Sequence, residues 1–212
     1  MRLFPAASRT AMPWRNGGGT TTEIAAFPEG AGIADFIWRV SIARIDRDGP
    51  FSSFPGVDRT LALLSGGPVT LTGPDWERTL STGSDPVAFD GADAIHARTA
   101  TPSTDLNVMT RRDRCRHTLR LLGLPARVAG SEQLLIAMGN GITCNTPRSS
   151  RWTRCSRNPE TGWSSTDRQA PACGVSRSPD APQRSAVPKS GERRRRPSPS
   201  SQCAYIRLNS SL

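Results

Sequence analysis

Two aromatic and two charged residues lie close together in a turn-rich segment between two predicted strands: Phe51, Phe54, Asp58 and Arg59. Binding groups usually lie on loops that rigid strands hold in place. An arginine there offers a two-pronged donor to a carboxylate. The alternative is structural, with both rings closing one end of a barrel and Asp58 paired with neighbours of Arg59. The residue types alone leave both hypotheses open.

A second group, Trp14, Arg15 and Asn16, precedes three consecutive glycines and offers a ring, a cation and an amide. The glycines match neither the dinucleotide fingerprint nor the phosphate-binding loop, so they do not predict a nucleotide site. They predict a backbone that passes close to another element or to a ligand, which a Cβ would prevent. A tryptophan that covers the core and an asparagine that holds a turn explain the same residues.

Metal and catalytic motifs are missing from the sequence. Its two histidines, His96 and His117, belong to no HxH or HExxH pair, and no cysteines have zinc spacing. We therefore expect no metal and no other cofactor. The absence of a GxSxG elbow leaves no residue to assign as catalytic. A metal-free enzyme would need a His–Asp pair, for which His96 with Asp58 or Asp105 is the candidate.

The elements that must position these residues are short strands. Residues 38–43 alternate, with Trp38, Val40 and Ile42 on one face, and residues 105–112 alternate in the same way. Further strands are predicted at 60–64, 68–72 and 78–81 and twice within 87–100. Strands every eight to twelve residues, separated by turn chemistry, predict an all-β fold, a sandwich or an antiparallel β-barrel.

The net charge of +10 is unevenly distributed, with +1 in residues 1–138 and +9 in residues 139–212. Val, Ile, Leu and Phe number only six in the second stretch, too few to offset the entropy of ordering it. We expect residues 146–212 to be a disordered basic tail or an out-of-frame translation, and the abrupt change favours the second. The Arg193–Arg196 run predicts no specific nucleic-acid partner. No stretch has membrane-spanning length and the N-terminus has no apolar signal region, so we expect no membrane partner and a cytoplasmic protein.

Four segments together resemble the HutD/Ves family of cupin-like proteins: PWRNGGGTTTEIA (13–25), WRVSIARIDRDGPFSSFPGVDRTLALLSG (38–66), HAR (96–98) and DLNVMTRR (105–112). The resemblance covers about residues 1–138 and departs at Arg15, where the family usually has lysine. It implies a two-barrel fold. Residues 1–112 would form the first cupin-like barrel and residues 113–145 the remnant of an incomplete second one.

The resemblance implies a small-ligand-binding regulator linked to histidine utilisation or stress response, rather than an enzyme. Its partner would be a small anionic metabolite such as a formylated glutamate-type acid, and a homodimer remains open. The alternatives are a metal-free cupin enzyme of the isomerase or epimerase type and a non-functional frameshifted product. The resemblance assigns ten residues to ligand binding: Trp14, Arg15, Asn16, Arg39, Phe51, Phe54, Asp58, Arg59, His96 and Asn107.

Overall fold

The computed structural model describes residues 2–4, 9–14, 17–129, 133–138, 142–145, 152–157, 173–176 and 202–210. The regular structure in these ranges consists of β-strands, and each strand pair is antiparallel. The prediction of an all-β fold built from antiparallel strands is therefore confirmed. No helix in the described ranges could cross a membrane.

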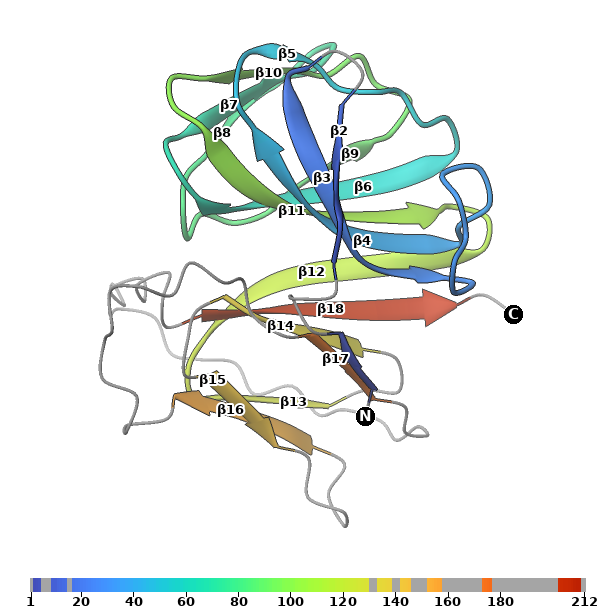
Figure 1. Cartoon of the computed structure of the whole chain (residues 1–212), viewed down its shortest axis with the longest axis vertical. Helices are drawn as coiled ribbons and strands as arrows, with labels where there is room; N and C mark the ends of the chain where they lie inside the picture. Colours follow the sequence, from blue (N-terminus) through green and yellow to red (C-terminus); the bar gives the residue numbers. More distant parts are fainter. Residues whose placement is uncertain are drawn as a thin grey trace.

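The first unit consists of two facing sheets, which form the upper half of Figure 1. The six-stranded sheet has the order β2 (Ala11–Pro13), β3 (Gly19–Phe27), β4 (Trp38–Ile45), β11 (Ser103–Arg111), β6 (Val57–Ser65) and β9 (Val87–Asp90). The four-stranded sheet has the order β5 (Gly49–Pro50), β10 (His96–Thr99), β7 (Val69–Thr72) and β8 (Glu77–Leu80). Apolar side chains of both sheets, including Leu61 and Leu71, form one buried cluster between them.

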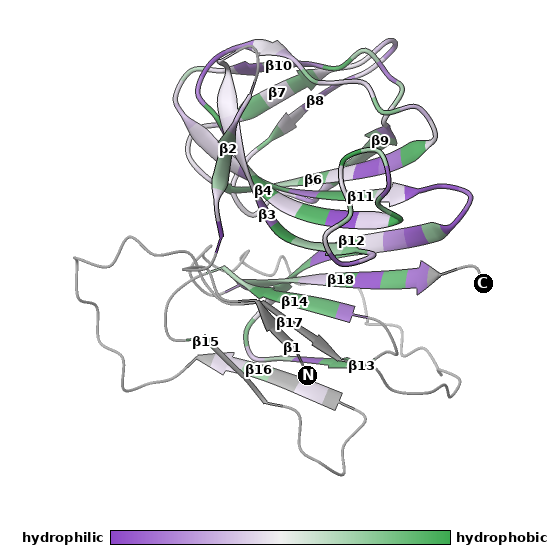
Figure 2. Ribbon diagram, turned by 45° about the vertical axis from the view of Figure 1, so that its right-hand side comes forward, coloured by the Kyte–Doolittle hydropathy of each residue, from purple (hydrophilic) through white to green (hydrophobic). Residues whose placement is uncertain are grey.

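Alternation along the central strands gives the six-stranded sheet two different faces. Residues directly opposite each other in neighbouring strands share a face, and Met109 lies opposite both Arg39 and Arg59. The intervening residues Val108 and Val40 point to the other face and are fully buried there. Figure 2 shows the resulting bands of hydrophilic and hydrophobic residues. The predicted alternation of residues 38–43 and 105–112 is thus confirmed.

The second unit lies below that apolar face (Figure 1). Its five-stranded sheet has the order β1 (Arg2–Phe4), β17 (Cys173–Ser176), β14 (Gln133–Ala137), β18 (Gln202–Ser210) and β12 (Cys115–Gly123). Its three-stranded sheet has the order β13 (Ala126–Ala129), β16 (Trp152–Arg157) and β15 (Ile142–Asn145). The largest buried cluster joins both units, because Val40, Leu106 and Val108 of the first pack with Leu134 and Ile206 of the second.

Three strands, β16, β17 and β18, lie within residues 146–212, which we expected to be a largely unstructured basic tail or an out-of-frame translation. β18 pairs with β12 over nine positions and also with β14. Ala204, Ile206 and Leu208 alternate along it and are buried, and this local pattern is hidden when apolar content is averaged over the whole tail. The expectation is wrong for these strands, and the rest of the tail lies outside the described residues. We retain a unit boundary near residue 112 as a proposal, since β11 belongs to the first unit and β12 to the second.

Candidate functional site

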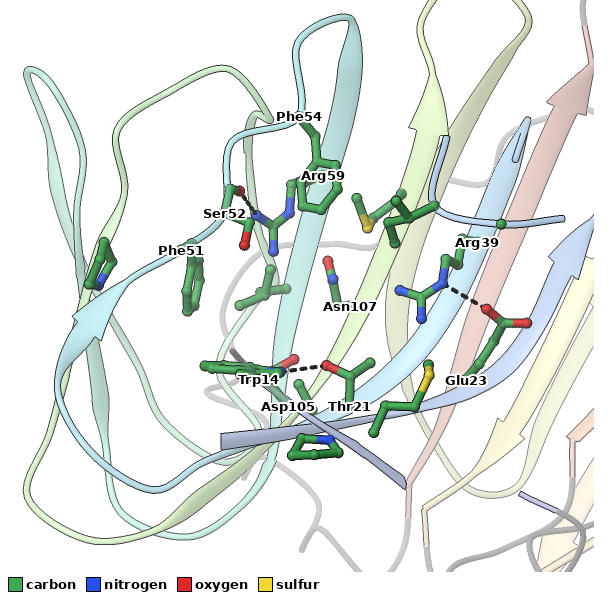
Figure 3. A pocket seen from close by; sticks show the side chains of 18 of the residues that line it. Trp14, Thr21, Glu23, Arg39, Phe51, Ser52, Phe54, Arg59, Asp105 and Asn107 are labelled. Carbon is green, nitrogen blue, oxygen red and sulfur yellow. Dashed lines mark hydrogen bonds and ion pairs between the residues drawn. The ribbon is translucent and has the colours of Figure 1, made fainter. Parts of the chain in front are cut away.

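A cavity of about 870 Å³ lies over the polar face of the six-stranded sheet (Figure 3). Strands β2, β3, β4, β6 and β11 line it, and the segments around Gly32 and Phe51 complete its wall. Its lining is mainly apolar but includes four charged side chains: Glu23, Arg39, Arg59 and Asp105. Such a mixture, a largely apolar hollow with a few converging polar groups, is typical of small-molecule sites.

Arg59 of β6 is a buried cation that faces this cavity. Its residue is only 7% exposed, and its guanidinium carbon lies 5.2 Å, 5.5 Å and 5.0 Å from the ring centres of Phe51, Phe54 and Phe89. Nη1 donates a hydrogen bond to the Ser52 carbonyl oxygen at 3.3 Å, while Nε is buried without a partner. Burial lowers the pKa of Arg59 to about 10, and the nearby Asp105 offsets part of that effect. The guanidinium is therefore charged at neutral pH.

Asp105 and Asn107 of β11 point into the same cavity from two residues apart. Both residues are buried, and the Oδ1 atom of each has no hydrogen-bond partner. Burial raises the pKa of Asp105 to about 7, although the positive charge of Arg59 counteracts part of the rise. Buried polar atoms are almost always hydrogen-bonded in folded proteins, so unpartnered ones facing a cavity indicate a place for a ligand or water.

Arg39 and Glu23, the other two charged residues, neutralise each other. Arg39 Nε donates to Glu23 Oε2 at 2.8 Å, and the Arg39 side chain is almost fully enclosed. Glu23 is partly exposed at the edge of the cavity. Arg39 and Glu23 thus form an ion pair. Arg59 and Asp105 form no ion pair with each other in the part of the chain that the structure describes.

Trp14 closes the cavity from the N-terminal side. Its Nε1 donates to Thr21 Oγ1 at 2.7 Å, and its ring meets Phe51 edge-on, with centroids 6.4 Å apart. The backbone at position 19 can lie this close to the backbone of Arg44 because the residue is glycine. A Cβ there would collide with the carbonyl oxygen of Arg44. The predicted role of the triple glycine, close backbone approach, is confirmed at Gly19.

The chain is similar to known proteins both in sequence and in fold. The HutD family model matches residues 6–172. The chain belongs to the HutD family. Two relatives named protein Ves are similar in sequence: one from Citrobacter koseri, 46% identical over 111 residues, and one from Cronobacter sakazakii, 40% identical over 123 residues. The aligned parts are 51% and 57% of this chain but only 56% and 66% of those relatives, so the chain spans less than two thirds of their length.

Two solved structures resemble the whole chain. HutD from Pseudomonas fluorescens SBW25 has a TM-score of 0.67 at 23% identity and covers 100% of this chain and 99% of its own. A conserved protein of unknown function from Pseudomonas aeruginosa PAO1 has the same TM-score at 24% identity, with coverages of 99% and 98%. At these identities the similarity shows the HutD-type fold and no more. It extends over the second unit, which the sequence had indicated only as a remnant.

Six of the ten residues that the resemblance assigned to ligand binding line the cavity of this HutD-family chain: Trp14, Arg39, Phe51, Phe54, Arg59 and Asn107. Arg15 and Asn16 lie outside the described residues. The prediction omitted Asp105 and Glu23. The alternation of residues 105–112 could have identified Asp105, because it places this residue on the same face as Asn107.

Asp58 and His96 do not line the cavity, and their assignment to ligand binding stays a prediction. Asp58 neighbours Arg59 in β6 and therefore points to the other side, where it accepts a hydrogen bond from Arg112 Nε at 2.7 Å. Asp58 thus forms an ion pair with Arg112, a residue far from it in the sequence. His96 is exposed on β10. The described part of the cavity therefore lacks the His–Asp pair that an isomerase or epimerase would need, and no cluster suited to a metal ion occurs among the described residues.

Proposed function

We propose that this HutD-family chain binds a small carboxylate on Arg59 and acts as a cytoplasmic ligand-binding regulator in histidine utilisation or stress response. The observation that carries the proposal is the state of Arg59: buried in a cavity and charged, yet with Nε unpartnered and no carboxylate paired to it among the described residues. Burying a charge without a partner is costly. A bound anion would remove that cost.

The geometry around Arg59 favours a planar anion. Three aromatic rings surround the guanidinium and contribute cation–π attraction, about 0.5–2 kcal/mol each where water is excluded. They compensate the charge only in part, and although Nη1 donates to the Ser52 carbonyl oxygen, Nε has no hydrogen-bond partner. A carboxylate accepts two parallel hydrogen bonds from a guanidinium, which supplies both charge and geometry.

The second polar group, Asn107, supports a ligand with a further oxygen or nitrogen. Its amide can present either its carbonyl oxygen or its NH₂ group to the cavity. A formylated glutamate-type acid has a carboxylate for Arg59 and a formyl oxygen for such an amide. The related HutD structure from Pseudomonas fluorescens is described as a formate condition, which makes formate a natural first probe.

Titration calorimetry with formate, acetate and N-formylglutamate tests the proposal. Arg59→Lys keeps the charge but loses the two-pronged geometry, so binding should weaken by about 1–3 kcal/mol, the scale of a charge-assisted hydrogen bond. The matched control is Arg98→Lys, whose parent arginine is exposed and pairs with Glu77 at 3.0 Å. Unchanged binding in Arg59→Lys, or no binding of any of the three acids to the wild type, would contradict the proposal.

A further inference from the structure

The four charged groups of the cavity differ in how they are compensated. Arg39 and Glu23 form a direct ion pair, so together they present no net charge to a ligand. Arg59 and Asp105 are both buried and make no ion pair with a described residue. Figure 3 shows Arg59 and Asp105 on the two sides of Asn107, both facing the hollow. An incoming anion therefore meets one uncompensated cation and one carboxyl group whose charge state can change.

The surroundings of Asp105 favour its protonated form. Ala43 of β4 and Leu63 of β6 lie directly opposite it in the register, so apolar groups flank the carboxyl group in the sheet. The charged groups that face the cavity from the packed strands are Arg59 on β6, Arg39 on β4 and Glu23 on β3, and the last two neutralise each other. Arg59 is thus the group that sustains a negative charge on Asp105, and the pKa of Asp105 still rises to about 7.

A carboxylate bound to Arg59 shifts the protonation equilibrium of Asp105 toward the neutral acid. It neutralises the cation that stabilises the Asp105 anion, and it adds a second negative charge to a cavity of low polarity. Two carboxylates that share a poorly hydrated site do not both remain ionised, so one of them takes up a proton. The protonated carboxyl group gains an O–H donor, and a ligand oxygen is the acceptor that the cavity would then contain.

We propose that Asp105 takes up one proton from solvent as a carboxylate binds to Arg59, and donates the resulting O–H to a ligand oxygen. The inference rests on the proposed function. The net reaction is ligand anion plus one proton, with no covalent bond made or broken in the ligand.

Calorimetric titration of the full chain with formate and acetate tests the inference when it is repeated in two buffers that differ in ionisation enthalpy. Near pH 8 the wild type should take up close to one proton per ligand bound, and near pH 6 much less, because Asp105 is then already protonated. Affinity should fall toward tenfold for each pH unit above the Asp105 pKa.

The second part of the test repeats the calorimetry with Asp105→Asn, because an amide imitates the uncharged acid. Its proton uptake should vanish and its affinity should become independent of pH. Asp75→Asn, which changes an exposed aspartate outside the cavity, should behave as the wild type. Carboxylate binding without proton uptake at pH 8 overturns the inference and leaves the proposed function intact. The absence of binding at every pH overturns both. If Asp105→Asn does not fold, the proton count of the wild type decides alone.

Discussion

Replacing Asp105 by asparagine should change how the stability of the unliganded protein depends on pH. The folded protein holds the Asp105 proton up to about pH 7, whereas an ordinary aspartate loses it near 3.8. Between these values the folded state binds more protons than the unfolded state, so the free energy of unfolding falls as the pH rises. The stability associated with the neutral acid is fully present below about pH 4 and is lost by about pH 7.

The size of this change in the free energy of unfolding follows from the shift in the pKa of Asp105. About three pKa units at 1.36 kcal/mol each give about 4 kcal/mol, which is an upper limit because buried groups relax and admit water. Asparagine has the same shape and no charge, so its cost does not change with pH. The stability of Asp105→Asn relative to the wild type should therefore increase steadily between pH 4 and 7 and be constant above pH 7.5.

Urea denaturation monitored by tryptophan fluorescence measures this difference, since Trp14, Trp38 and Trp76 all lie in the first unit. Curves at pH 4.5, 6, 7 and 8 give the free energy of unfolding of each variant, and Asp75→Asn serves as the control for a lost exposed charge. The reasoning is refuted if the wild type and Asp105→Asn differ by the same amount at all four pH values.

Three further changes test other parts of the fold. His117 bridges Thr110 and Thr60 through hydrogen bonds of 2.8 Å each, and burial lowers its pKa to about 4. The free energy of unfolding should therefore fall as the pH drops from about 6.5 to 4. His117→Gln should lose that pH dependence in acid denaturation curves. Arg112→Gln breaks ion pairs to two aspartates at the partly exposed edge of the sheet, and the small drop in melting temperature should disappear in 1 M salt. Ile206→Ala opens a cavity in the core that joins the two units and should cost about 2–5 kcal/mol by urea denaturation, a loss that a disordered tail would not show.

Much of the site could be predicted from strand periodicity alone. Arg39 and Asn107 each lie between two apolar residues, so their common face could be predicted once the strands were assigned. Arg59 lies between Asp58 and Thr60, and its place on the same face follows from its register with Met109. The same rule argues against Asp58, since adjacent residues in a strand cannot face one cavity. The four-stranded sheet that carries His96 is a different case, because which side of a short strand faces inward depends on how the two sheets meet.

The tail shows where composition fails as a predictor. Averaged over residues 139–212, large apolar residues are too sparse for a core, yet Ile206 and Leu208 fall in one short stretch with the alternation of a strand. A strand needs only one buried face, and β12 with β14 provides the neighbours that complete it. That dependence on partners distant in sequence cannot be recognised from the tail alone.

The cavity and the joint between the two units are two faces of the same strands, and this couples them mechanically. Asn107 faces the cavity, while its neighbours Leu106 and Val108 are fully buried in the cluster shared with the second unit. Protein interiors are close-packed, so a shift of that cluster displaces β11 as a whole rather than one side chain. Asp105, which lies on the same strand, would move with it relative to Arg59 on β6. The affinity of the proposed carboxylate site should therefore depend in part on residues of the second unit that do not line the cavity, including the alternating apolar residues of β18.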